Sequence, residues 1–277
     1  MSVKSFRPNT PGRRQMTMLV NNTITVSKPT KKLLVPLKKN AGRNNRGIIT
    51  CRHRGGGSRR QYRLIDFKGS KLNIPGTIKS IEYDPNRSAN IALVCYPDGD
   101  KRYMIAPEGL KTGDNVIVSP KAELKIGNRL QLKNIPTGFN IHNIELSPQR
   151  GGQIVRSAGS SAMVIGRDGS KIQVKLPSSS IILVHEDCMA TIGQVSNLDH
   201  SNVKIGKAGR TRHFGRRPKV RGKVMNPVDH PHGGGEGRNS IGLKYAKTPW
   251  GAHALGVKTR KMRKYSQTRI IKDRRKK

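Results

Sequence analysis

The residues best equipped for chemistry lie in one short run, residues 225–237, with the sequence MNPVDHPHGGGEG. The run holds two histidines, two acids, two prolines and four glycines, without helical or strand periodicity. Imidazole and carboxylate groups bind metals and transfer protons, so the run could form a metal site or a catalytic loop. In a strand, His230 and His232 would project from one face. Asp229 or Glu236 could then complete a ligand shell.

A metal or catalytic site needs a scaffold that fixes its ligands, and this run offers little of one. Pro231 separates the two histidines, and three glycines follow them. The chain has no G-x-S-x-G nucleophile motif, no Walker-type phosphate loop and no dinucleotide fingerprint. Its three cysteines, Cys51, Cys95 and Cys188, are far apart and lack the paired spacing of a zinc site. We therefore expect no catalytic residue, no bound metal and no cofactor.

Charge is distributed unevenly along the chain, whose formal net charge is +39. Residues 1–60 carry 15 Lys or Arg and no acid, and residues 203–277 carry 23 Lys or Arg against three acids. Residues 61–202 are nearly balanced, with 17 basic and 13 acidic residues. Flanks of such charge repel themselves, so we expect them to be extended or disordered until a polyanion neutralises them. Clusters of Lys and Arg at both ends of a chain predict nucleic acid as that polyanion.

An anionic membrane is the competing polyanion. Membrane-surface segments need an amphipathic helix with bulky apolar residues opposite the basic ones. Glycines and prolines interrupt both basic flanks, among them Pro8, Pro11, Gly215 and Pro218. No apolar run approaches the roughly 20 residues that span a bilayer. We therefore expect neither a membrane partner nor, without any nucleotide or cofactor motif, a small-molecule substrate.

The charge-balanced middle of the chain predicts β-structure. Apolar runs at residues 91–96 and 102–105 flank an Asp-Gly pair, and so do the runs at 162–165 and 171–176. Asp-Gly between apolar runs is a hairpin signal. Further strands are expected at residues 62–67, 76–83 and 181–184, and one short helix at residues 152–157.

Short strands separated by turn signals are typical of small barrels. Residues 61–202 are too many for one five-stranded barrel and suffice for two, with a break near residues 121–136. We predict an all-β fold of two small barrels in tandem with long basic extensions. The predicted divisions are an N-terminal extension 1–60, a first barrel 61–125, a second barrel 126–202 and a Gly/Pro-rich C-terminal extension 203–277.

The aromatic content bears on how RNA would be held, because modules that read single strands stack bases on surface aromatics. Phe, Trp and Tyr make up 4% of the chain. Five of them lie in strand patterns and are expected in the core: Tyr62, Phe67, Tyr83, Tyr96 and Tyr103. We therefore expect contacts to phosphate, ribose and RNA shape, made by Arg, Lys and backbone amides.

Particular basic residues stand out as RNA contacts. Arg87 follows a turn that would present it from a strand end, and Arg156 lies among small residues that let a phosphate backbone approach. Either could equally be an ordinary solvated charge. Residues 52–60, RHRGGGSRR, combine exposed backbone N–H groups with five basic residues, although a flexible linker is the alternative. The RNA-binding candidates are Arg52, His53, Arg54, Arg59, Arg60, Arg87, Arg156, Arg216, Arg217, Arg221, His230, His232 and Arg238.

Several long motifs follow one another along nearly the whole chain. They lie at residues 42–47, 52–57, 81–87, 141–145, 190–195, 226–237, 248–251 and 258–260. In these motifs the chain resembles the universal large-subunit ribosomal protein number two of bacterial and plastid type, the ribosomal protein L2 family. The ending at residues 254–266 resembles plastid and cyanobacterial members, which favours a chloroplast ribosome over one in the bacterial cytoplasm.

The resemblance implies an oligonucleotide-binding-fold barrel followed by a Src-homology-three-like barrel, with tails that enter the large-subunit RNA. It implies a structural constituent of the ribosome and not an enzyme. The implied partners are large-subunit ribosomal RNA, other ribosomal proteins and the small subunit at the subunit interface. It also implies support for subunit association and for the peptidyl-transferase region, where RNA performs the chemistry. Carried over by motif, Arg87 and Arg156 become RNA contacts, and His230 approaches the catalytic RNA.

Two other functional classes remain open from the residues alone. One is a metal-dependent RNA-processing enzyme that uses His230, His232 and Asp229. The other is a free RNA chaperone or DNA-compacting protein. RNA hydrolysis by the pure protein would distinguish the first, and failure to sediment with large subunits would distinguish the second.

Overall fold

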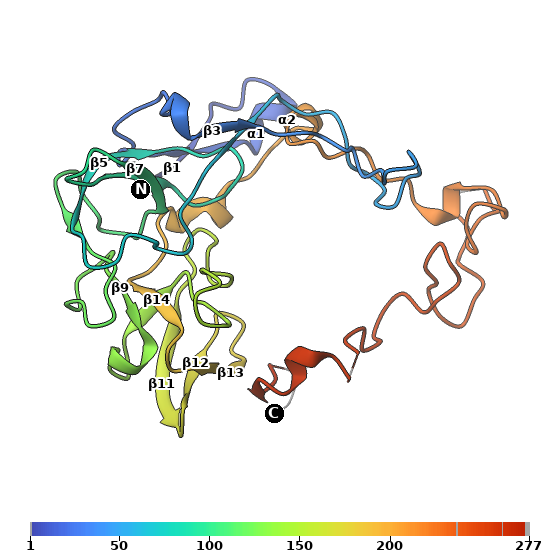
Figure 1. Cartoon of the computed structure of the whole chain (residues 1–277). Coiled ribbons are helices and arrows are strands. Elements are labelled where there is room, and N and C mark those ends of the chain that lie inside the picture. The colour runs from blue at the N-terminus through green and yellow to red at the C-terminus, as the bar shows by residue number, and fades with distance from the viewer. Residues whose placement is uncertain (1, 237, 262, 275–277) are drawn as a thin grey trace. The chain divides into compact units, whose positions relative to one another are not determined.

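A computed structural model of the chain describes residues 2–236, 238–261 and 263–274 (Figure 1). Gly237 of the run 225–237 and Met262 of the plastid-like ending lie outside the described residues. So do Met1 and residues 275–277, which belong to the predicted extensions. Among the helices of the described part, none combines the length and the apolar character needed to cross a membrane.

The chain divides into two compact units. The barrel unit comprises Met1–Lys38, Arg59–Ala208 and Thr268–Lys277, and the loop unit comprises Lys39–Ser58 and Gly209–Gln267. Every named strand of the described chain belongs to the barrel unit. The predicted divisions after residues 60, 125 and 202 remain a proposal.

The first sheet has the strand order β7-β6-β5-β8, with antiparallel neighbours throughout. Its strands are β5 (Gly76–Glu82), β6 (Ile91–Cys95), β7 (Lys101–Ile105) and β8 (Asn115–Val116). The predicted hairpin is confirmed: β6 and β7 pair directly, and the N–H of Tyr96 closes their turn on the C=O of Asp100 at 3.0 Å. Alternate side chains such as Ile78 and Val94 form a buried core on one face.

The second sheet has the order β15-β13-β12-β11-β10-β14-β9 and is also antiparallel. The predicted hairpin is again confirmed, because β11 and β12 pair across the turn near Gly169. Leu130, Val164 and Val174 lie at the centre of its core. Its strands are β9 (Arg129–Gln131), β10 (Asn140–His142), β11 (Ala162–Asp168), β12 (Lys171–Lys175), β13 (Ile181–His185), β14 (Met189–Ile192) and β15 (Ile270–Lys272).

Shorter elements complete the chain. Two further antiparallel pairs join β1 (Ser2–Ser5) to β2 (Thr17–Val20), and β3 (Leu34–Pro36) to β4 (Gln61–Arg63). The helical turns are α1 (Pro11–Arg14), η1 (Lys31–Leu33), η2 (Leu132–Asn134), η3 (Leu198–Asn202), α2 (Ala208–His213), η4 (Gly222–Val224) and η5 (Tyr265–Gln267). Both large sheets curl into barrel-like shapes, so the predicted all-β fold of two barrels is confirmed.

The short helix predicted at residues 152–157 is wrong. The N–H of Gln153 donates to the C=O of Ile144 at 2.8 Å, and the N–H of Asn143 donates to the C=O of Val155 at 2.8 Å. Val155 also has φ of 55°, outside the right-handed helical region. Helix nucleation makes so short a helix marginal on its own, so pairing with another segment determines the conformation here.

The expected burial of Tyr83 is also wrong, since 55% of this residue is exposed. The preceding Glu82 is 3% exposed and accepts a hydrogen bond from the hydroxyl of Tyr103 at 2.7 Å. Tyr83 lies one residue beyond the end of β5, where the chain leaves the sheet and the residue is exposed. Tyr103 itself is fully buried, as predicted.

The two barrels meet in a hydrogen-bonded junction within the barrel unit. The N–H of Glu108 donates to the C=O of Gln194 at 2.8 Å, beside a β-bridge between Pro107 and Val195. Nδ2 of Asn197 donates to the C=O of Ser88 at 2.6 Å. The N–H of Ala158 also donates to Oγ of Ser88 at 3.0 Å. This contact joins the loop after β5 to the segment before β11, where two of the predicted RNA-binding arginines lie.

Candidate nucleic-acid interface

Asp84 organises the turn that follows β5. Its carboxylate is buried, and Oδ1 accepts a hydrogen bond from the N–H of Asn86 at 2.9 Å. Oδ2 accepts a hydrogen bond from Nε of Arg87 at 2.6 Å, and Nη1 of Arg63 lies 3.6 Å from Oδ1. An Asp side chain commonly fixes a turn by binding the N–H two residues ahead. The side chain of Arg87 is 15% exposed, so this arginine is held in place and is not an ordinary solvated charge.

Phe67 lies beside two of the predicted arginines. Cζ of Arg156 is 4.5 Å from the centroid of the Phe67 ring, and Cζ of Arg87 is 5.7 Å from it. Such cation–π contacts contribute about 0.5–2 kcal/mol, more where water is excluded. Nη1 of Arg156 also donates to the C=O of Gly152 at 3.1 Å, and the N–H of Gly152 donates to the C=O of Phe67 at 2.8 Å. We name Phe67, Arg87 and Arg156 the arginine–aromatic cluster.

The arginine–aromatic cluster has the chemistry of a phosphate site. Guanidinium groups meet phosphate oxygens through two parallel hydrogen bonds, which favours arginine over lysine for this purpose. Ordering a free, long side chain on binding costs about 0.5–1.5 kcal/mol. Arg87 and Arg156 are ordered in advance, by a buried carboxylate and by an aromatic ring, so less of that cost arises on binding.

Three more arginines line an open groove of ≈ 590 Å³ in the barrel unit. Arg59, Arg60 and Arg63 share it with Pro36 and Pro85. Nη1 of Arg60 donates to the C=O of Pro85 at 2.7 Å, which ties this arginine to the turn that carries Arg87. The groove is open to solvent and basic.

In the loop unit, the structure pairs the glycine-rich segment 52–58 with the basic segment 213–218. The N–H of Gly55 donates to the C=O of Gly215 at 3.0 Å, and Arg54 forms an antiparallel bridge with Arg216. The N–H of Arg217 donates to the C=O of His53 at 3.0 Å, and the ring of His53 contacts the C=O of Pro218 at 2.8 Å through Nδ1. The glycine-rich segment is thus a paired strand-like element and not a flexible linker.

Close backbone approach explains why glycine is needed in this pairing. A Cβ atom on Gly57, where φ is +85°, would lie 2.7 Å from the backbone nitrogen of Gly215. The pairing brings together candidates that are far apart in the sequence, from residues 52–54 and 216–217. Most are exposed to solvent: Arg52, Arg54, Arg216 and Arg217.

His230 and His232 lie together in the loop unit, with ring centroids 4.7 Å apart. His230 is 7% exposed, and its Nδ1 accepts a hydrogen bond from the N–H of His232 at 3.1 Å. Its ring packs on Gly222, where an added Cβ would lie 2.5 Å from the imidazole. Nε2 of His232 accepts a hydrogen bond from the N–H of Lys247 at 2.8 Å. Each ring thus has one nitrogen engaged in holding the loop.

The electrostatics around His232 favour a neutral imidazole. Desolvation, followed by the nearby His230 and Lys247, lowers the pKa of His232 below its ordinary value. Asp229 is exposed, and no group of three or more His, Cys, Asp or Glu side chains in the described chain is placed to hold a metal ion. The described part of the run 225–237 is therefore a hydrogen-bonded loop. Two further candidates, Arg221 and Arg238, are exposed, as is Arg59 of the groove.

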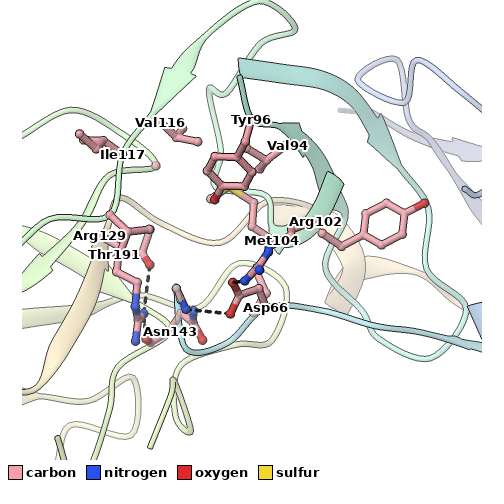
Figure 2. Close-up of a pocket in the computed structure, with 15 residues that line it drawn as sticks. Asp66, Val94, Tyr96, Arg102, Met104, Val116, Ile117, Arg129, Asn143 and Thr191 are labelled. Atoms are coloured by element: carbon pink, nitrogen blue, oxygen red, sulfur yellow. Dashed lines mark hydrogen bonds and ion pairs between the residues drawn. The ribbon is translucent and has the colours of Figure 1, made fainter. Parts of the chain in front are cut away.

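A small cavity of ≈ 40 Å³ lies in the barrel unit, lined by apolar side chains and by a few charged ones (Figure 2). Figure 2 shows Arg102 directed at Asp66, at 2.9 Å, and Arg129 directed at Thr191 and the backbone of Asn143. Burial raises the pKa of Asp66, but hydrogen bonds from Arg102 and from backbone N–H groups outweigh that effect and hold the pKa below its usual value. Such a cavity has room for a few water molecules at most and is too small for a nucleotide.

A buried ion pair adjoins this cavity. Nη2 of Arg129 lies 3.0 Å from Oε1 of Glu145, and both side chains are almost completely buried. Oε1 of Glu145 also accepts a hydrogen bond from the N–H of Gly151, and Oε2 accepts one from the N–H of Met189. Removing one partner of such a pair is costly because it leaves a buried charge. This pair therefore supports the segment that carries Arg156.

The sequence did not reveal Phe67 and Asp84 as residues that position Arg87 and Arg156. The role of Asp84 could have been predicted, because the sequence Asp-Pro-Asn-Arg is typical of a turn that an Asp side chain caps. The role of Phe67 could not have been predicted, since Arg87 and Arg156 follow it by 20 and 89 residues and contact it only in the folded barrels.

Comparison with known protein families gives two matches to this chain. The family model described as Ribosomal Proteins L2, RNA binding N-terminal domain, matches residues 30–118. The family model described as Ribosomal Proteins L2, C-terminal domain, matches residues 125–251. Together they cover well over half of the chain and include all of the predicted RNA-binding residues.

Proposed function

The chain belongs to the ribosomal protein L2 family, and from that premise we propose that it binds large-subunit ribosomal RNA through phosphate and shape contacts as a structural constituent of the ribosome. Family membership makes it a ribosomal protein with an RNA-binding N-terminal domain. Its partners are ribosomal RNA and other ribosomal proteins.

The loop unit carries the main support for this proposal. Residues 39–58 and 209–267 contain 20 Lys or Arg and two acids, a formal charge of +18. The paired segments 52–58 and 213–218 are fixed by backbone hydrogen bonds, which leaves exposed guanidinium groups available. A surface of this charge gains affinity for RNA by releasing the counterions of the phosphates that it neutralises.

The barrel unit contributes a second RNA contact in the same proposal. The arginine–aromatic cluster would bind phosphate oxygens, and the groove beside Arg59 and Arg60 would receive the adjoining backbone. The remaining contacts would come from the loop unit: Arg52, His53, Arg54, Arg216, Arg217, Arg221, His230, His232 and Arg238.

His230 has a supporting role in this proposal. We place the loop 225–237 near the peptidyl-transferase region, where RNA performs the chemistry, and propose that the protein also supports association with the small subunit. The near-complete burial of His230 and its hydrogen bond from His232 favour a role in shaping the loop. The plastid-like ending extends the proposal to a chloroplast ribosome, in preference to one in the bacterial cytoplasm.

Equilibrium binding to a large-subunit ribosomal RNA fragment tests the proposal. We expect the logarithm of the association constant to fall linearly with the logarithm of salt concentration, by about 0.9 per phosphate contacted. The variant Arg216→Ala/Arg217→Ala should reduce that slope by roughly two contacts. A binding constant that is insensitive to salt would contradict the proposal. RNA hydrolysis by the pure protein, lost in His230→Ala, would favour the metal-dependent enzyme instead.

A further inference from the structure

Trp250 is the single tryptophan of the chain, and 80% of it is exposed. Trp250 lies outside the strand patterns that predict buried aromatics. Every buried hydrophobic residue of the described chain lies in the barrel unit, so the loop unit does not use Trp250 as core. Tryptophan is enriched at binding interfaces, because its ring covers a large apolar area and its N–H can donate a hydrogen bond.

The segment that displays Trp250 is a short hairpin. Lys247 and His253 form an antiparallel bridge at its base. The N–H of Gly251 donates to the C=O of Thr248 at 2.9 Å, so Trp250 occupies the third position of a tight turn. Gly251 has φ of +81°, a conformation that glycine adopts without strain. The indole is therefore carried at the tip of the hairpin.

Contacts within the loop unit hold this hairpin in place. The N–H of Lys247 donates to Nε2 of His232 at 2.8 Å, which ties the hairpin to the histidine loop. The rings of Tyr245 and His253 meet edge to face, with centroids 4.3 Å apart. Cζ of Arg52 lies over the Trp250 ring at 6.0 Å, a contact that leaves most of the indole open. A platform fixed in this way loses little entropy on binding.

We propose that Trp250 is a stacking platform for an unpaired base of RNA. Every base has a planar π face that stacks on an aromatic ring, whatever its sequence. Arg52, Lys244 and Lys247 supply positive charge in the same unit, which matches the phosphates on either side of a stacked base. The inference rests on the proposed RNA binding. It adds stacking on a base to the contacts with phosphate groups.

Fluorescence of the full-length protein tests this directly, because Trp250 is its only tryptophan. The probes are oligoadenylate of about twelve nucleotides and an abasic RNA backbone of the same length, both short enough for one site. We expect both to bind, as followed by the anisotropy of a label on the RNA. Only oligoadenylate should quench the tryptophan emission. Equal quenching by both probes, or none by either while both bind, would overturn the stacking platform.

Variants at the same position separate stacking from charge. Trp250→Leu should weaken oligoadenylate binding roughly fivefold to a hundredfold, while Trp250→Phe should retain most of the affinity. Neither should change binding of the abasic probe or the salt dependence, because neither removes a phosphate contact. Oligoadenylate affinity that is unchanged in Trp250→Leu, or an equal loss for the abasic probe, would refute the inference. If ribosomal RNA and both probes all failed to bind the wild-type protein, the proposed function itself would be wrong.

Discussion

Replacing Arg87 by alanine should reduce folding stability as well as RNA affinity, because Arg87 neutralises a buried carboxylate. Asp84 is inaccessible to solvent, and Nε of Arg87 is 2.6 Å from its Oδ2. Removing one partner of a buried ion pair costs roughly 3–5 kcal/mol. Arg63 remains 3.6 Å from the carboxylate, and Arg87 is itself slightly exposed, so we expect the lower end, about 3 kcal/mol.

Thermal unfolding followed by circular dichroism measures this loss. In a domain of this size, about 3 kcal/mol corresponds to a fall in Tm of roughly 6–12 °C. Arg167→Ala is the matched control, because Arg167 forms an ion pair with Glu186 while its own side chain is 60% exposed. Exposed pairs contribute about 0–1 kcal/mol, so this variant should unfold close to the wild-type temperature.

The double variant Asp84→Asn/Arg87→Ala separates stability from binding. Removing the buried charge should restore part of the stability that Arg87→Ala loses, because an amide costs less to bury unpaired than a carboxylate. RNA affinity should remain low, since the guanidinium is still absent. A wild-type Tm for Arg87→Ala, or recovery of RNA affinity in the double variant, would refute the assigned roles of Asp84 and Arg87.

Three further variants test other parts of the structure. Arg156→Ala should weaken RNA binding about tenfold and reduce the salt slope by about one contact, with a stability loss near 1 kcal/mol in thermal melts. Burial lowers the pKa of His142 to about 4 from 6.5, so the unfolded chain binds more protons between these values. Stability should therefore fall by about 3 kcal/mol as the pH drops from 6.5 to 4, and His142→Gln should flatten that dependence in urea melts. Gly57→Ala should accelerate hydrogen exchange at the paired segments, whereas Gly47→Ala, which has similar φ and nothing within 4 Å, should not.

The hairpins could be predicted because their determinants are local. Asp-Gly turns at residues 98–99 and 168–169 join strands that are neighbours in sequence and in the sheet. Strands β9, β10 and β14 are only three or four residues long, and their partners lie elsewhere in the chain. Three or four residues are too few to show the alternation of apolar and polar side chains that predicts a strand. These strands are therefore seen only in the folded sheet. β15 could not be predicted for a different reason. It lies within a basic tail that was expected to be extended or disordered, and it becomes a strand by pairing with β13.

The candidate interface could be predicted in residue type but not in geometry. Charge identified the arginines of residues 52–60 and 213–221, yet nothing in the sequence indicated that these two segments pair. Likewise, the sequence suggested Arg87 and Arg156 separately, while Phe67 joins them only in three dimensions. Contacts between residues far apart in sequence depend on the whole fold, which local patterns do not encode.

Sedimentation of the tagged chain from a bacterial extract and a chloroplast extract tests the ribosomal assignment most directly. We expect the chain to migrate with large subunits through a gradient at high salt, where most electrostatic association between free protein and RNA is lost. The variant Arg216→Ala/Arg217→Ala should shift part of the chain to the top of that gradient. A chain that remains at the top in both extracts, or that leaves the subunits as soon as salt is raised, would contradict a structural role in the ribosome.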